Sequence, residues 1–280
     1  MDSSAVGENA TLTPRMVKAQ VNYLASHCHE PKVNNGDFTK NVFPLEAREN
    51  IIFDAESFDV APSLDVEGFC RVKHEYDVSG LADSVEAAVP FRASLAALLK
   101  ELTGADEVNM LESSMVRSQA SSGIEKDIEK GVPAPMAHSD STEAGAPTAE
   151  HYFYPKPSRP NVRRTVQVNL WKLLSSSPTP IPLAMCDVRS LRAGDIVGGP
   201  AYFPSIDASI DTAFFHPNDH MRWVYFSRLN NQELLIFKQY DSDKRYPVRV
   251  PHTAFEDPSC PPDAEPRVSI ESRALLRWYD

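Results

Sequence analysis

The sequence predicts a mainly β fold of the jelly-roll or barrel type, with helices flanking the sheets. Short runs of alternating apolar residues follow one another in the second half of the chain at spacings of roughly ten to twenty residues, which is typical of such folds. Only residues 83–103 carry a clear helical stripe of apolar side chains. The 23 prolines against 11 glycines also favour extended segments, ordered turns and long loops.

The length of 280 residues is enough for one large core, so we expect a single domain over residues 15–280 after a loose polar tail at residues 1–14. The net charge of −11 argues against a nucleic-acid binder, which needs a basic face. No run of about 18 apolar residues is present, which argues against a membrane span. The first residues lack the basic and apolar regions of a signal peptide, so the expected location is the cytoplasm.

The four cysteines are scattered along the chain and form no Cys-x-x-Cys pair, so a structural zinc site is not expected. In a cytoplasmic protein we expect them to be free and mostly buried thiols.

The first half of the chain is expected to contain short strands and one helix. The strands are predicted at residues 16–24, 51–53 and 69–72, with two more within 107–116. For the helix, Asp83 and Glu86 resemble a capping box, Gly104 is a C-terminal stop, and Pro90 suits a first turn. Its apolar stripe should pack on a sheet; the stripe consists of Phe91, Leu95, Leu98, Leu99 and Leu102.

The middle of the chain is expected to be irregular, and the rest to be mainly β. Residues 118–134 are polar and without periodicity, which indicates a mobile loop that could act as a lid. Residues 143–162 are rich in proline and predict an irregular excursion around an aromatic cluster that includes Phe153 and Tyr154. Later strands are predicted at residues 165–171, 183–186, 223–226, 233–240, 246–250 and 267–276.

The first candidate for chemistry is the pair His138 and Asp140, between the predicted loop and the irregular excursion. In an extended segment, residues two apart point to the same side. One imidazole and one carboxylate on one side are two of the three ligands of a facial iron site. The pair alone is weak evidence, because a surface turn with a local His–Asp hydrogen bond has the same sequence.

Four later histidines could supply a third ligand. His151 lies in the proline-rich segment, and His216 and His220 flank a turn. His252 ends an extended, proline-bordered run, and the last strongly β-patterned stretch starts afterwards at Arg267. The residues alone leave this choice open.

Several short runs of sequence together resemble one protein family. Four of them are residues 168–171 (Val-Asn-Leu-Trp), 220–226 (His-Met-Arg-Trp-Val-Tyr-Phe), 251–258 (Pro-His-Thr-Ala-Phe-Glu-Asp-Pro) and 267–275 (Arg-Val-Ser-Ile-Glu-Ser-Arg-Ala-Leu). The run 182–187 (Pro-Leu-Ala-Met-Cys-Asp) belongs with them. They resemble the Fe(II)/2-oxoglutarate-dependent oxygenases that include the fungal gibberellin desaturase, aspergillic acid hydroxylase-like proteins and the smaller chain of the bacterial cephem methoxylase. The resemblance covers residues 16–277 and is most specific from His220 to Leu275.

The resemblance implies a double-stranded β-helix, a cupin-like jelly-roll, with Fe(II) held by His138, Asp140 and His252. It implies 2-oxoglutarate and O2 as co-substrates, with 2-oxoglutarate decarboxylated to succinate while a small secondary-metabolite-type molecule is hydroxylated or desaturated. Arg267 would anchor the distal carboxylate of 2-oxoglutarate, with Ser269 adding a hydrogen bond. Arg273 is the rival anchor, because an even offset places it on the same strand face.

Other residues could line the site. Asn169 could contact the co-substrate, and His220 is the rival third ligand or faces the substrate. The remaining candidates for substrate contact are Arg117, Trp171, Trp223, Tyr225 and Phe255, each of which could instead be a solvated or core side chain.

Two departures from the family pattern prevent transfer of a substrate from any relative. Residues 143–162 replace a longer, arginine-rich helical segment, and Lys172-Leu173 stand where Arg-Pro is usual. Two other functions also stay open: a non-catalytic partner subunit of a two-chain oxygenase, and a cupin-like metal enzyme that needs no 2-oxoglutarate. A homodimer is an open alternative for the assembly.

Overall fold

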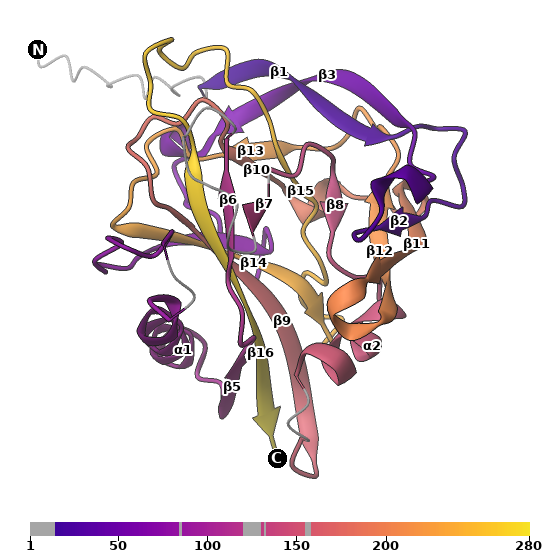
Figure 1. Ribbon diagram of the computed structural model, residues 1–280, viewed down its shortest axis with the longest axis vertical. Helices are drawn as coiled ribbons and strands as arrows, with labels where there is room; N and C mark the ends of the chain where they lie inside the picture. The colour runs from indigo at the N-terminus through magenta and orange to yellow at the C-terminus, as the bar shows by residue number, and fades with distance from the viewer. Residues whose placement is uncertain (1–14, 84–85, 120–129, 132, 155–157) are drawn as a thin grey trace, which may run out of the picture.

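Two facing β-sheets make up most of the computed structural model, which describes residues 15–83, 86–119, 130–131, 133–154 and 158–280 (Figure 1). The prediction of a mainly β jelly-roll with few helices is confirmed. The predicted tail at residues 1–14 and most of the predicted lid at 118–134 lie outside the described residues.

The larger sheet carries the strands at residues 16–24 and 45–54 at one edge and the candidate ligands near its middle. Its nine strands run in the order β1 (Met16–Leu24), β3 (Leu45–Asp54), β13 (Trp223–Tyr225), β10 (Leu183–Cys186), β15 (His252–Ala254), β8 (His138–Ser139), β12 (Ala208–Phe215), β11 (Ile196–Phe203) and β2 (Val33–Asn34).

The second sheet is built on long antiparallel strands. Its order is β4 (Phe69–Lys73), β14 (Glu233–Asp241), β9 (Val162–Leu173), β16 (Val268–Tyr279), β6 (Met115–Ser118) and β7 (Lys130–Gly131), and β5 (Glu107–Met110) also pairs with β16.

The alternation of side chains along β9 divides the core into two layers. Val166, Val168 and Leu170 face outward and pack against helix α1 (Ala88–Thr103). Trp171 and Leu173 face the larger sheet, in a second cluster that includes residues of β10 and β13. The side chains at odd positions of β9 therefore point into the space between the sheets, where the candidate site lies.

Helix α1 confirms the predicted helix, although its beginning differs. It ends at Gly104, whose φ of 65° is the left-handed conformation that glycine adopts readily. Ala87 occupies the N-cap position without a side-chain cap, so the predicted capping box of Asp83 and Glu86 was wrong. Pro90 lies in the first turn, as predicted.

The prediction of an irregular segment at 143–162 was wrong in part, because helix α2 spans Gly145–Phe153. The Thr142 hydroxyl accepts a hydrogen bond from the Gly145 amide at 3.0 Å and fixes the start of the helix. Gly145 also lies so close to β12 that a Cβ there would be 2.1 Å from the Asp211 carbonyl oxygen. Gly145, which suggested a loop in the sequence, is thus needed for close packing between α2 and β12.

Further strand assignments differ from prediction. Residues 246–250 form no strand; Pro247 lacks the amide hydrogen that a ladder requires. β11 and β12 were not predicted. β11 contains Gly198, Gly199 and Pro200, and the low strand propensity of glycine and proline explains why this strand was not predicted.

The cysteines Cys28, Cys70, Cys186 and Cys260 are free thiols, as expected. Among the described residues, no helix has the length and apolar character needed to cross a membrane.

Candidate metal centre

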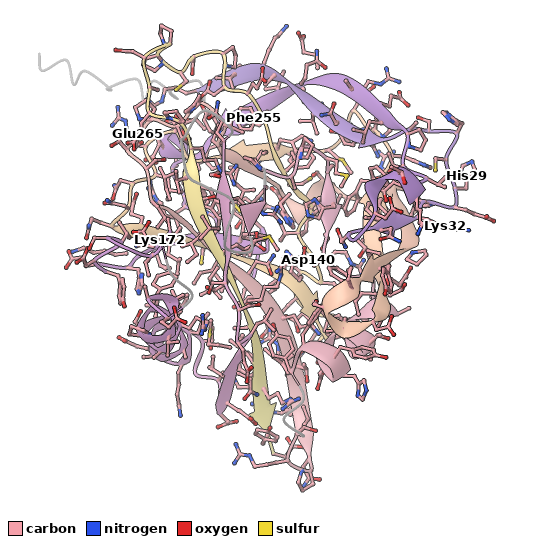
Figure 2. All side chains as sticks on the ribbon, viewed as in Figure 1. His29, Lys32, Asp140, Lys172, Phe255 and Glu265 are labelled. Atoms are coloured by element: carbon pink, nitrogen blue, oxygen red, sulfur yellow. The ribbon has the colours of Figure 1, made fainter. Side chains whose placement is uncertain are left out.

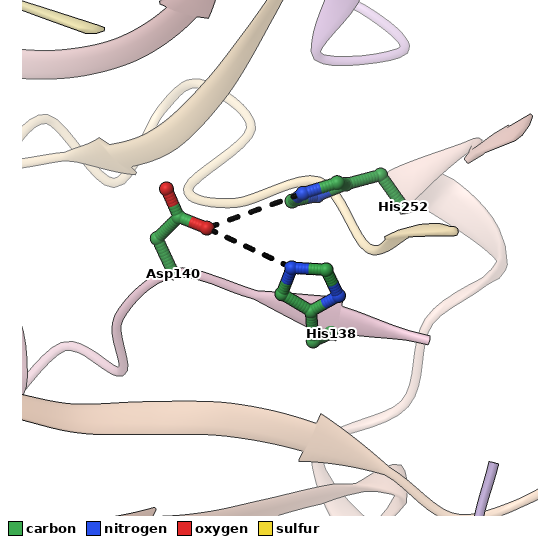
Figure 3. A group of neighbouring side chains, drawn as sticks. All are labelled: His138, Asp140 and His252. Atoms are coloured by element: carbon green, nitrogen blue, oxygen red, sulfur yellow. Dashed lines mark ion pairs between the residues drawn. The ribbon is translucent and has the colours of Figure 1, made fainter. Parts of the chain in front are cut away.

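Three side chains that the sequence singled out meet between the two sheets (Figure 3). β8 and β15 are neighbouring strands, and their pairing places His252 directly opposite His138. Asp140 follows β8 immediately, and its Oδ1 lies 3.9 Å from His138 Nε2 and 4.0 Å from His252 Nε2. One ligand atom from each of the three residues lies within 4.8 Å of the others. Figure 2 places Asp140 near the centre of the molecule.

Both imidazoles are oriented by the backbone. His138 Nδ1 lies 2.9 Å from the Met136 carbonyl oxygen, and His252 Nδ1 lies 3.2 Å from that of Val250. These contacts place the hydrogen on Nδ1, which leaves the Nε2 lone pairs directed toward Asp140. Burial lowers the pKa of His138, and burial together with the neighbouring His138 lowers the pKa of His252 to about 3. Both rings are therefore neutral at neutral pH, as metal ligands must be.

The two oxygens of Asp140 have different surroundings. Oδ2 accepts hydrogen bonds from Arg273 Nε at 2.7 Å and Asn169 Nδ2 at 3.0 Å, while Oδ1 faces the histidines. Burial alone would raise the pKa of Asp140, but the positive charge of Arg273 and the hydrogen bond from Asn169 hold it below its usual range. The carboxylate is ionised and has one oxygen directed toward the imidazoles.

The segment between β8 and α2 is anchored by a residue of β14. The Gln239 side-chain oxygen accepts hydrogen bonds from the Ser139 hydroxyl at 2.8 Å and from the Asp140 amide at 2.7 Å. Gln239 is buried, and sequence reasoning missed it because no motif marks it.

A small pocket opens beside the two histidines, and Arg117, Trp171, Arg267 and Glu271 line it together with Ala134, Leu183, Thr253 and Ala254. Sequence reasoning also missed Glu271. Its even offset from Arg267 on the same strand was the available signal.

Arg267 is a buried cation in this pocket, with 1% of its surface exposed. Its Nε donates to Ser269 Oγ at 3.2 Å, its Nη1 donates to the Ile181 carbonyl oxygen at 3.0 Å, and its guanidinium stacks on Trp171. No carboxylate of the described residues pairs with it, and burial, with Arg117 nearby, lowers its pKa to about 9. Burying an unpaired charge is costly, so this geometry favours an anion in the pocket.

Arg273 has a different environment from Arg267. Its Nε contacts Asp140, its Nη2 lies 2.6 Å from Glu271 Oε1, and it is not among the residues that line the pocket. Trp171 contributes an indole Nε1 that is buried and has no hydrogen-bond partner within the described part of the chain.

The three rival histidines lie away from this cluster. His151 is exposed on α2, His216 bonds to the Cys28 carbonyl oxygen, and His220 is exposed in the turn before β13. The geometry therefore groups only His252 with the His138–Asp140 pair among the described residues.

Three aromatic candidates for substrate contact pack elsewhere. Trp223 and Tyr225 alternate with Val224, so they point away from the space between the sheets, and Trp223 Nε1 donates to Tyr23 Oη at 2.7 Å. Phe255 packs edge-to-face on Tyr225 in the same cluster. Arg117 and Trp171 are the two predicted substrate contacts that line the pocket.

Lys172, one of the residues that depart from the family pattern, also lies outside the pocket. Its ammonium group points toward the α1 side of the sheet, where it donates to the His74 carbonyl oxygen at 2.7 Å (Figure 2).

Comparison with known proteins places this geometry in a family. The family described as oxidoreductase/YMDC permease-like domain matches residues 17–277. The Fe(II)/2-oxoglutarate-dependent dioxygenase nvfI of Aspergillus novofumigatus is 30% identical over 197 residues, which are 69% of this chain and 68% of that protein. The hydroxylase/desaturase CTB9 of Cercospora beticola is 28% identical over 239 residues, 78% of this chain and 72% of that protein.

The fold is similar to a solved structure as well. The iron and alpha-ketoglutarate-dependent endoperoxidase NvfI superposes with a TM-score of 0.81 at 26% identity, covering 96% of this chain and 100% of that chain.

Proposed function

The chain belongs to the oxidoreductase/YMDC permease-like family and is an Fe(II)/2-oxoglutarate-dependent oxygenase, and from this premise we propose that His138, Asp140 and His252 hold the iron. Two neutral imidazoles and one ionised carboxylate form the facial ligand set that suits non-heme Fe(II) and leaves positions open. The observation that carries the proposal is the buried, unpaired Arg267 in the pocket beside these ligands.

Fe(II), when bound with 2-oxoglutarate and O2, supplies an oxidant that removes hydrogen from a carbon atom while 2-oxoglutarate is converted to succinate and CO2. The chain itself contributes orientation and charge. Both imidazoles stay neutral and point their Nε2 atoms inward because the backbone holds Nδ1. Asp140 stays ionised because Arg273 and Asn169 donate to one of its oxygens.

Arg267 is the proposed anchor for the distal carboxylate of 2-oxoglutarate. A guanidinium can bind a carboxylate through two parallel hydrogen bonds, and an incoming anion would neutralise a charge that is now buried and unpaired. Ser269 orients the Nε side of the guanidinium. The Trp171 indole N–H, which lacks a partner in the described residues, is a second donor available to the co-substrate.

The substrate is proposed to be a small molecule of secondary-metabolite type. Relatives are named hydroxylases and desaturases, and one structural relative is an endoperoxidase, so the outcome after hydrogen removal differs within the family. Arg117 is the proposed contact for substrate at the pocket. Of the two alternatives, the non-catalytic subunit is disfavoured by the complete ligand set, and the enzyme without 2-oxoglutarate by the unpaired Arg267.

The proposal also covers the location of the protein and its partners. We propose a cytoplasmic enzyme that acts on a small molecule and binds neither membrane nor nucleic acid; the net charge of −11 supports the absence of nucleic-acid binding, which needs a basic face. We propose one functional unit over residues 15–280, and a homodimer stays an alternative to the monomer.

The test is anaerobic addition of Fe(II) and then 2-oxoglutarate, followed by visible absorption. We expect a weak charge-transfer band in the wild type, loss of the band at the same 2-oxoglutarate concentration in Arg267→Ala, and recovery of the band in this variant at a higher 2-oxoglutarate concentration. A wild type without the band, and without succinate formation with candidate substrates, would support the non-catalytic subunit. An Arg267→Ala variant with unchanged activity would support an enzyme that does not use 2-oxoglutarate.

A further inference from the structure

Arg273 and Asn169 approach the same atom from two strands. They are directly paired across β16 and β9, so their side chains stand on one face of the sheet. Both donate to Asp140 Oδ2, at 2.7 Å and 3.0 Å. The other oxygen, Oδ1, is left toward the Nε2 atoms of His138 and His252.

Glu271 contacts Arg273 through a different nitrogen of the guanidinium. It lies two residues earlier on the same strand face, it is 5% exposed, and its Oε1 lies 2.6 Å from Arg273 Nη2. The guanidinium thus contacts two carboxylates, those of Glu271 and Asp140. This arrangement leaves Arg273 committed to the protein, in contrast to Arg267, which has no carboxylate partner among the described residues.

We infer that Arg273 and Asn169 are positioning residues that keep Asp140 a one-oxygen ligand, an inference that rests on the proposed metal site. Two hydrogen bonds occupy Oδ2, so a metal ion meets Oδ1 alone. Rotation of the carboxylate to offer both oxygens would break both hydrogen bonds and would fill a coordination position that the co-substrates need. Glu271 stabilises the arrangement by orienting Arg273.

The experiment measures Mn²⁺ affinity by titration calorimetry in two variants. Arg273→Lys keeps the positive charge and loses the planar fork, and Asn169→Leu keeps the branched shape of the side chain and removes the donor. Because partners that orient metal ligands are typically worth about 10–100-fold in metal affinity, each variant should bind Mn²⁺ more weakly by a factor in that range. Asn169→Leu leaves no new unpaired charge, so it tests the inference even where a change at Arg273 prevents folding.

The matched control is Arg164→Lys. Arg164 lies on the same strand as Asn169 and pairs with the buried Asp241 through Nε and Nη2 at 3.0 Å and 2.5 Å. Its side chain lines a different pocket from the one beside the histidines. It should retain the Mn²⁺ affinity of the wild type, which separates positioning of Asp140 from loss of any buried arginine pair.

Wild-type Mn²⁺ affinity in both folded variants would overturn the inference. Unchanged Mn²⁺ affinity with weakened 2-oxoglutarate binding in Arg273→Lys would also overturn it, because Arg273 would then be a co-substrate anchor. A wild type that binds no Mn²⁺ is a different result: it removes the proposed metal site, whatever the variants do.

Discussion

At the scale of single residues, local hydrogen bonds decide which side chains can act together. The backbone carbonyls of Met136 and Val250 select the same tautomer in both histidines. His220, by contrast, lies exposed in a turn, where its amide donates to the Asn218 side chain. Substitution of His252 and substitution of His220 should therefore have different effects on metal binding.

We expect His252→Ala to weaken Mn²⁺ or Fe(II) binding by more than about 100-fold, since loss of a direct ligand should exceed the 10–100-fold typical of a supporting residue. His220→Ala should bind the metal like the wild type. Titration calorimetry on both variants checks this, and retention of metal by His252→Ala would transfer the third-ligand role to another residue.

A second residue-scale prediction concerns His74, which packs against α1. Burial, and then the charge of Lys172, lower the pKa of His74 from 6.5 to about 4. Between these two pH values the unfolded chain binds more protons at this residue than the folded one, so its contribution to stability is present above pH 6.5 and is lost as the pH falls toward 4.

The free energy of unfolding, measured in urea across this pH range, should therefore fall more steeply in the wild type than in His74→Asn. The comparison with the variant cancels the titration of carboxyl groups that the two proteins share. Equal slopes would show that His74 titrates normally in the folded protein.

At the scale of elements, strands with plain alternation were predictable and closely packed elements were not. β1 matches its predicted range, Met16–Leu24, because its apolar residues alternate. β11 was missed because glycine and proline interrupt its pattern, and α2 because Gly145 and nearby prolines indicate a loop. In both cases the glycine is needed because another segment packs closely against it, and local propensity does not predict such tertiary contacts.

The close contact at Gly145 gives a prediction for α2. A Cβ at this position would lie 2.1 Å from the Asp211 carbonyl oxygen, so Gly145→Ala must shift α2 or β12. Overpacking of this kind typically costs about 1–3 kcal/mol, and the free energy of unfolding in urea should fall by that amount.

The control is Gly194→Ala, because no atom lies within 4 Å of a Cβ at Gly194. This variant should keep the stability of the wild type within about 0.5 kcal/mol. Equal stability of the two variants would mean that α2 does not pack on β12 as described.

At the scale of the whole molecule, the two sheets bring together residues that lie far apart in the chain. His138, His252 and Arg267 come from three separate segments and meet beside one pocket. The His-x-Asp spacing alone could not identify the third ligand, and the family resemblance pointed to His252 and Arg267. The side chains of Trp223, Tyr225 and Phe255 pack in a separate cluster, and this could not be predicted because a sequence does not show which face of a buried strand points inward.

A metal that binds the folded chain only should stabilise the whole molecule. At a free metal concentration of about 100 times the dissociation constant, the gain is about 2.7 kcal/mol by mass action. We expect Mn²⁺ to raise the Tm of the wild type and to leave that of Asp140→Ala unchanged, as measured by thermal unfolding. An equal rise in both would indicate metal binding outside the proposed centre.

The most direct test of the account is an anomalous-scattering map at the iron edge from crystals grown anaerobically with Fe(II) and 2-oxoglutarate. We predict one iron peak bounded by His138 Nε2, His252 Nε2 and Asp140 Oδ1, with the distal carboxylate of 2-oxoglutarate on Arg267. An iron peak on other residues, or the carboxylate on Arg273, would contradict it.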